Sequence, residues 1–131
     1  MSVEPTVVII IDANGLGHQP GETLTGEYWV NGLHSGRVQA IEASVLWHTE
    51  GKGDEDLAVC AFWRRESERG QPLDPSRPEP FSVTLPNSPL SYDGQIVKVR
   101  WCVRVRVFLN RRRELVGEKV FQLGHLPRVR E

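Results

Sequence analysis

A group of basic residues near the carboxyl end is the clearest candidate for chemistry in this sequence. Four of them are two or four residues apart, a spacing that would place them on one face of a β-strand: Lys98, Arg100, Arg104 and Arg106. Three more follow that segment: Arg111, Arg112 and Arg113. A stripe of this kind has the charge to bind nucleic acid, an anionic membrane or an acidic protein surface.

The charge of the whole chain decides between these partners. The 131 residues carry 16 Lys plus Arg and 17 Asp plus Glu, so the net charge is −1. Such a chain lacks the positive field of nucleic-acid-binding proteins, and no nucleic acid is expected as a partner. The residues from Gln95 onward contain ten basic and three acidic side chains, a local charge of +7, and the first 94 residues carry −8.

The acidic excess must lie close to the basic stripe in so small a protein. Cross-strand ion pairs are therefore expected, and the candidate acids are Glu27, Glu42, Glu114 and Glu118. The alternative, which stays open, is that a partner protein binds the stripe. Its binding residues would then be Lys98, Arg100, Arg104, Arg106, Arg111 and Arg112.

Other sets of reactive side chains give weaker signals. Glu50, Asp54 and Asp56 lie in an acidic loop that suits a hard cation such as calcium, but their spacing does not match an EF-hand. The four histidines follow no metal-ligand spacing and are expected at the surface or at strand ends. No GxSxG elbow and no glycine-rich loop leading into a helix occurs, so no enzyme, catalytic residue or cofactor is predicted.

The cysteines and the apolar runs bear on location. Cys60 and Cys102 have no ligand spacing, and both are expected to be packing residues that remain thiols. The longest apolar run, residues 7–11, is too short to cross a bilayer, so no integral membrane segment is expected. The amino end does not have the pattern of a secretory signal, and a cytoplasmic location is predicted.

Alternation of apolar and polar residues predicts strands throughout the chain. The longest alternating segment covers residues 96–110, with the odd-numbered residues facing the core. Residues 6–11 form a β-branched run that suits a strand buried on both faces or at a sheet crossing. Residues 37–50 fit a helix or a strand, and the alternation of Ile41, Ala43, Val45 and Trp47 favours the strand. Further strands are expected at 23–31, 57–65, 81–85 and 115–123.

These strands predict an all-β fold with one core. Short strands separated by Gly- and Pro-rich turns, with no convincing helix, are typical of an immunoglobulin-like β-sandwich, here of about seven to eight antiparallel strands. Residues 1–131 are expected to form a single domain, because the length is close to the commonest domain size. Residues 67–80 contain four prolines among charged residues and are expected to form an exposed loop.

Three segments resemble the arrestin-like sandwiches, a family that includes arrestins, arrestin-domain adaptors, retromer subunits and bacterial sporulation-control homologues. They are PGETLTGEYWV at 20–30, the strand at 38–47, and FSVTLP with PLSYDG at 81–94, which lead into the long basic strand. In the last segment, Pro86 and Pro89 would stiffen a crossing between sheets and Gly94 would form a positive-φ turn. Tyr92 would close one end of the sandwich and hydrogen-bond the backbone through its hydroxyl.

The resemblance covers most of residues 6–123 and implies a solitary domain of the amino-terminal arrestin type. It implies a non-enzymatic adaptor that binds a protein partner through strand edges or the basic strand face. Edge pairing would also allow a homodimer. The alternative is a small sandwich that binds a ligand, a glycan or calcium, with Trp29, Trp63 or the acidic loop as its platform.

Overall fold

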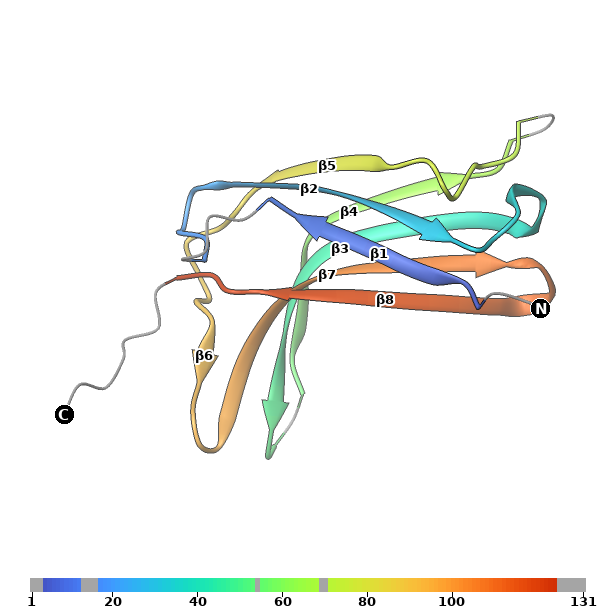
Figure 1. Cartoon of the computed structure of the whole chain (residues 1–131). Coiled ribbons are helices and arrows are strands. Elements are labelled where there is room, and N and C mark those ends of the chain that lie inside the picture. Colours follow the sequence, from blue (N-terminus) through green and yellow to red (C-terminus); the bar gives the residue numbers. More distant parts are fainter. Residues whose placement is uncertain (1–3, 13–16, 54, 69–70, 125–131) are drawn as a thin grey trace.

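The computed structural model describes residues 4–12, 17–53, 55–68 and 71–124, and these residues form two antiparallel sheets packed face to face (Figure 1). The smaller sheet has three strands in the order β1 (Thr6–Ile11), β2 (Thr23–Asn31) and β5 (Glu79–Thr84). The larger sheet has five: β4 (Leu57–Glu66), β3 (Val38–Gly51), β7 (Val97–Leu109), β6 (Tyr92–Asp93) and β8 (Arg113–Phe121). Two 3-10 turns, η1 (Ser35–Arg37) and η2 (Asn110–Arg112), precede β3 and β8. The predicted all-β sandwich is therefore confirmed.

The core is built on the pairing of β3 with β7, which continues from Val38 opposite Leu109 to Gly51 opposite Val97. Alternate residues of both strands point between the sheets and are buried there: Ile41, Ala43, Val45, Trp101, Val103, Val105 and Val107. The ambiguous segment at 37–50 is therefore a strand from Val38 onward, as its alternation predicts. From the smaller sheet, Leu24, Tyr28 and Phe81 pack against this layer.

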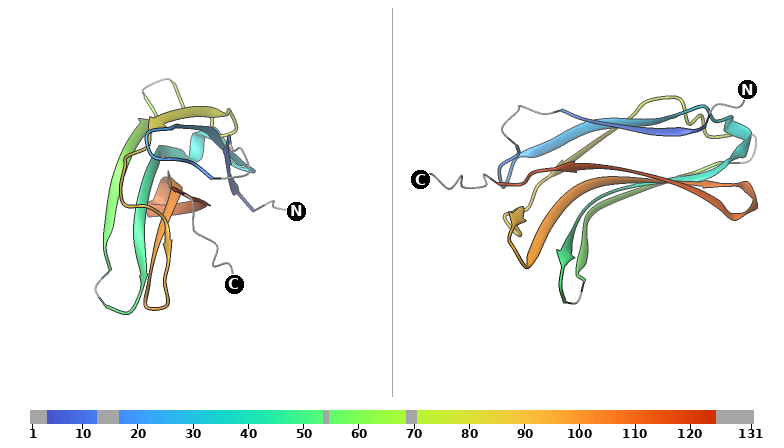
Figure 2. Two further views of the ribbon diagram at one scale, coloured as in Figure 1. Left: turned by 90° about the vertical axis from the view of Figure 1, so that its left-hand side faces the viewer. Right: turned by 60° about the horizontal axis from the view of Figure 1, so that its bottom comes forward.

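At one end, β3, β4 and β7 bend away from the smaller sheet and form an arm with β6 (Figures 1 and 2). In β4, Val59 lies opposite Leu46 while Ala61 lies opposite Val45, so Cys60 is an extra residue that forms a β-bulge. Because of this extra residue, the side chains before the bulge point to the opposite face from the one that uninterrupted alternation predicts. Val59 is consequently on the outer face and half exposed, although uninterrupted alternation would place it on the same face as Ala61.

Two further expectations hold only in part. Strand β1 is an edge strand with partly exposed residues, and it is not buried on both faces. The segment 67–80 is not an exposed loop throughout, because the backbone of Val30 donates a 2.7 Å hydrogen bond to the Pro75 carbonyl and Pro75 is buried. Its last residues, Glu79 and Pro80, already belong to β5.

At the crossing between the sheets, which is the segment between β5 and β7, Tyr92 and Gly94 do not have the roles expected of them. Trp101 is fully buried, and its Nε1 donates a 2.8 Å hydrogen bond to the carbonyl of Pro89. Ser91 pairs with the backbone of Leu123 through two 2.8 Å hydrogen bonds. Tyr92 is 54% exposed and does not close the sandwich. Gly94 has no positive φ; it is required because a Cβ there would lie 2.4 Å from the Tyr92 ring.

The close packing between the strands of the smaller sheet predicts the effect of one substitution. In Gly26→Ala, the new Cβ would lie 2.2 Å from the Ile10 carbonyl oxygen and 2.6 Å from the Phe81 ring. We expect the free energy of unfolding in urea to fall by about 3 kcal/mol, since backbone and ring must both move. Gly36→Ala is the control, because nothing lies within 4 Å of its Cβ, and it should change stability by less than about 0.5 kcal/mol. Equal effects of the two variants would contradict this account of the packing.

Candidate interaction site

The four basic residues of β7 project from the outer face of the larger sheet, and each lies near a carboxylate. Arg104 Nε is 2.7 Å from Glu118 and Arg106 Nε is 2.7 Å from Glu114, both across the β7–β8 pair. The hydrogen bond from Arg106 also holds the pKa of Glu114 below its ordinary value. The strand pattern thus predicts the shared face and two of its acidic partners correctly.

In the arm, the partners of the basic residues differ from those predicted. Lys98 Nζ is 3.4 Å from Asp93 Oδ1, and Arg100 Nε is 3.6 Å from Glu50 Oε2. Asp93 belongs to β6, a two-residue strand that the alternation does not reveal. Of the other predicted acids, Glu42 pairs with Arg64 of β4. Glu27 lies on β2 in the opposite sheet and was wrongly predicted as a partner.

The basic residues beyond β7 differ from those within it. Arg111 and Arg112 are exposed and have φ values of 63° and 58°, in a region that residues with a side chain adopt at a cost. Asn110 Nδ2 donates a 3.2 Å hydrogen bond to the Gly36 carbonyl, which ties this turn to η1. We define the cationic tip as four arginines, none of which has an ion pair within the described residues: Arg37, Arg111, Arg112 and Arg113.

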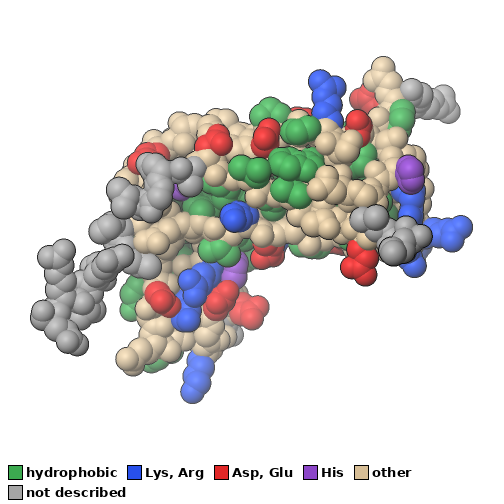
Figure 3. All heavy atoms as spheres, in the orientation of Figure 1, with side chains coloured by type: hydrophobic (Ala, Val, Ile, Leu, Met, Phe, Trp, Pro, Cys, Tyr) green, Lys and Arg blue, Asp and Glu red, His purple; other side chains and the backbone are tan. Residues whose placement is uncertain are grey.

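The cationic tip forms one end of the sandwich, where Lys and Arg side chains gather in the space-filling view (Figure 3). Beside it is a hollow of 400 Å³ whose lining includes Leu33, Arg37, Leu109, Arg113 and Leu115. Its wall therefore combines apolar side chains with two guanidinium groups. Glu4 and Glu114 also line the hollow, and Glu114 is already paired with Arg106. The arrangement suits an acidic peptide segment better than a metal ion or a cofactor.

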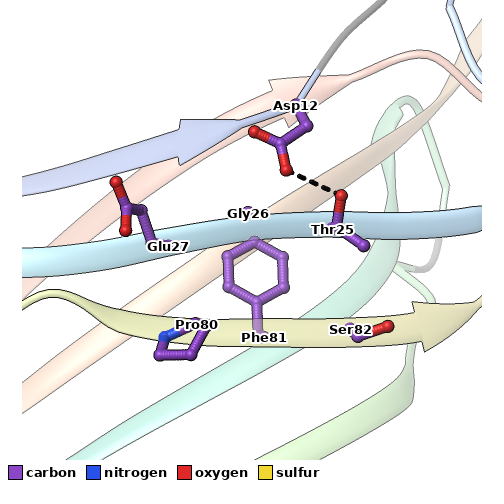
Figure 4. A pocket seen from close by; sticks show the side chains of 7 residues that line it. All are labelled: Asp12, Thr25, Gly26, Glu27, Pro80, Phe81 and Ser82. Atoms are coloured by element: carbon purple, nitrogen blue, oxygen red, sulfur yellow. Dashed lines mark hydrogen bonds between the residues drawn. The ribbon is translucent and has the colours of Figure 1, made fainter.

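A second hollow, of 550 Å³, lies between β2 and β5 over Gly26 (Figure 4). Thr25 Oγ1 donates a 2.7 Å hydrogen bond to Asp12 Oδ2 there, and Glu27 is the other charged residue of the lining. Two carboxylates without a neighbouring base or nucleophile form no catalytic set. This hollow therefore gives no functional assignment.

Of the three candidate metal ligands, the two that the structure describes do not gather into a site. Glu50 is occupied by its ion pair with Arg100, and the backbone N–H of Asp56 donates to Thr49 Oγ1 at 2.9 Å. Asp54 lies outside the described residues. Within the described ranges, no group of three or more His, Cys, Asp or Glu side chains could hold a metal ion.

His18 is buried, whereas the histidines are expected at the surface or at strand ends. Only 5% of it is exposed, and its ring stands edge-on to Phe121 with the centroids 5.7 Å apart.

The two tryptophans considered as platforms for a ligand lie on strands of different sheets. Trp63 packs against the core with its ring 5.9 Å from that of Phe81, whereas Trp29 is half-buried on β2.

The two cysteines have different surroundings, although the sequence predicts packing for both. Cys102 is fully buried beside Arg104 and Glu118, and Cys60 is exposed on β4. Burial, assisted by the negative charge of Glu118, raises the pKa of the Cys102 thiol to about 11. Both are free thiols.

The two antiparallel sheets form a β-sandwich with an arrestin-like fold. Among solved structures, the chain is similar to Spo0M, a sporulation control protein from Bacillus subtilis, with a TM-score of 0.61 and 17% sequence identity. The match covers 91% of this chain and 49% of that protein, so the chain spans about half of its length. No protein-family model and no curated protein sequence matches the chain. In the part of the chain that the structure describes, no helix is long and apolar enough to cross a membrane.

The β7–β8 ion pairs can be tested by exchanging their charges. Arg104→Glu places a second carboxylate opposite Glu118, and we expect it to lower the free energy of unfolding by about 1 kcal/mol. The exchanged pair Arg104→Glu/Glu118→Arg should recover most of this loss, and about 1 M NaCl should shrink both effects. If the double variant loses as much free energy of unfolding as the two single variants together, the two side chains do not interact.

The cysteines give a second prediction. At about pH 8, a chromogenic disulfide reagent should modify one thiol per folded chain, because only Cys60 is accessible and Cys102 remains protonated. Unfolding in urea should release the second thiol, and Cys60→Ser should leave the folded chain unreactive. Rapid modification of two thiols in the folded protein would refute the burial of Cys102.

Proposed function

We propose that this chain is a non-enzymatic protein-interaction domain that binds an acidic segment of a protein partner at the cationic tip. The observation that carries the proposal is the difference between the two groups of basic residues. Those on β7 are paired within the sheet, and the four tip arginines are without an ion pair among the described residues. A partner's carboxylates can therefore bind the tip without displacing acids of this chain.

The backbone of the tip supports the same proposal. Two consecutive residues with positive φ are usually glycine or asparagine, and here they are Arg111 and Arg112. Backbone strain of this kind, of order 1 kcal/mol per residue, is concentrated at functional sites. A sequence selected for stability alone would favour smaller residues at both positions.

Lys98, Arg100, Arg104 and Arg106 on β7 remain predicted partner-binding residues. A partner carboxylate that binds them must first displace Asp93, Glu50, Glu118 or Glu114, so we expect them to contribute less affinity than the tip. The neighbour Spo0M is named for a control function, which accords with a regulatory, non-catalytic role for this chain. We place the chain in the cytoplasm, a location that its free thiols favour.

A variant of the tip can separate binding from stability. Arg111→Asn/Arg112→Gly removes two charges and installs residues that tolerate positive φ. We expect its affinity for a fluorescein-labelled poly-glutamate peptide, measured by fluorescence anisotropy at low salt, to fall at least about tenfold. Its free energy of unfolding should rise by about 1 kcal/mol or more, because the strain is relieved.

The control removes the same charge elsewhere. Lys52→Asn/Lys119→Gln changes two exposed lysines outside the tip and should leave the affinity within about twofold of the unmodified chain. Equal loss of binding in both double variants would show that net charge alone attracts the peptide. Unchanged binding in the tip variant would overturn the proposed site.

A further inference from the structure

Strand β4 is the outermost strand on one side of the larger sheet and pairs only with β3 among the described strands. It is ten residues long, and its residues from Leu57 to Trp63 are uncharged. Edge strands of this length are usually protected by charges or proline, because their unpaired N–H and C=O groups attract another strand. On the opposite side of the sheet, β8 packs against β1, where a Cβ on Gly117 would meet the Val7 side chain at 2.6 Å. The free edge of β4 is thus a site for strand pairing.

The outer face beside this edge is apolar. Leu57, Val59 and Phe62 are 53%, 51% and 54% exposed, and all three project from the same face of β4. Val59 and Phe62 lie on either side of the bulge at Cys60. Because the bulge adds one residue, an odd-numbered and an even-numbered residue point to the same face. An added strand would cover these side chains.

The charges at the two ends of β4 indicate what the added strand is. Glu55 and Asp56 precede the uncharged stretch, and Arg64 and Arg65 follow it. A second copy in antiparallel orientation brings the acidic end of one β4 beside the basic end of the other, at both ends of the pairing. The register that pairs Val59 with Phe62 of the second copy keeps outer-facing residues opposite outer-facing ones. It also places Asp56 opposite Arg65.

The surroundings of Arg65 fit this register. Its Nη1 lies 3.3 Å from Glu79, and its guanidinium stands over the Tyr28 ring, 5.9 Å from the centroid. Its Nε is buried and has no hydrogen-bond partner among the described residues, which is a costly state for a charged donor. A hollow of 390 Å³ opens beside Arg65 at the β4 edge, lined also by Trp63 and Arg64. A carboxylate of the second copy that enters this hollow supplies an acceptor.

Arg64, which already pairs with Glu42, lies beside the remaining acidic residues. In the same register Glu66 falls opposite Glu55 of the second copy, and Arg64 Nε already lies 2.8 Å from Glu66. Arg64 is also diagonal to Glu55 of the second copy, within reach of a long side chain. The two bulges lie at the centre of the pairing, so both strands bend at the same point.

We propose that two copies of this chain associate through antiparallel pairing of their β4 edges, with Val59 opposite Phe62 and Asp56 opposite Arg65. The two larger sheets then form one continuous sheet across a two-fold axis. This surface is separate from the cationic tip, so each proposal can fail while the other stands.

The test is sedimentation equilibrium of the full chain at concentrations up to about 100 μM. We expect a dimer, and Val59→Lys should raise its dissociation constant at least about tenfold, because a charge replaces a central apolar contact twice in the interface. Val116→Lys is the matched control: it makes the same change at a residue 52% exposed on the same sheet face, but on β8. It should leave the dimer unchanged.

A change of charge tests the register. Asp56→Lys, at an exposed position, should weaken the dimer, and Asp56→Lys/Arg65→Glu should restore it by exchanging the charges. Urea unfolding of every variant separates dissociation from loss of the fold. A monomer at all concentrations, or a dimer broken by Val116→Lys and not by Val59→Lys, would overturn the proposal. A dimer that survives both lysine substitutions would overturn it as well.

Discussion

The pairing of β3 with β7 is the constraint on which the rest of the structure depends. The two strands have 14 and 13 residues, whereas the strands of the facing sheet have 6 to 9. The pair therefore covers the core and extends beyond it, and the excess length forms the arm (Figure 2). Because side chains alternate along a strand, burial of one face of β7 places its basic residues on the other. Both the core and the charged face follow from this pairing.

Features that depend on local alternation could be predicted from the sequence. The bounds of β1 and β2 coincide with the predicted segments, and β3 was identified as a strand despite its partial helical pattern. The change of face within β4 could not be predicted, because it arises from an extra residue at Cys60 opposite an uninterrupted β3. Nothing in the residues around Cys60 marks such a bulge, which depends on the partner strand.

Features that depend on distant segments were predicted less well. Glu114 and Glu118 were identified because a hairpin brings β8 beside β7, but Glu27 is on the other sheet and Asp93 lies in a strand of two residues. His18 is buried because its segment forms a bridge with Leu123, more than a hundred residues later in the sequence. The six predicted binding residues are therefore close in sequence but differ in their neighbouring charges. The four on β7 are paired with carboxylates, whereas Arg111 and Arg112 have no ion pair among the described residues.

The distribution of charge follows from which residues have a neighbouring strand. The segment with a charge of −8 and the segment with +7 are brought together because β3 and β6 flank the start of β7, while β8 flanks its remainder. Acids on those strands lie within reach of each cation of β7, and they neutralise it. Arg111 and Arg112 lie in the turn between β7 and β8, and Arg113 lies opposite the apolar Leu109, so no carboxylate stands across from these arginines. The unpaired charge of the tip is thus a consequence of the topology, and the two strained arginines maintain it at a position where glycine would be less costly.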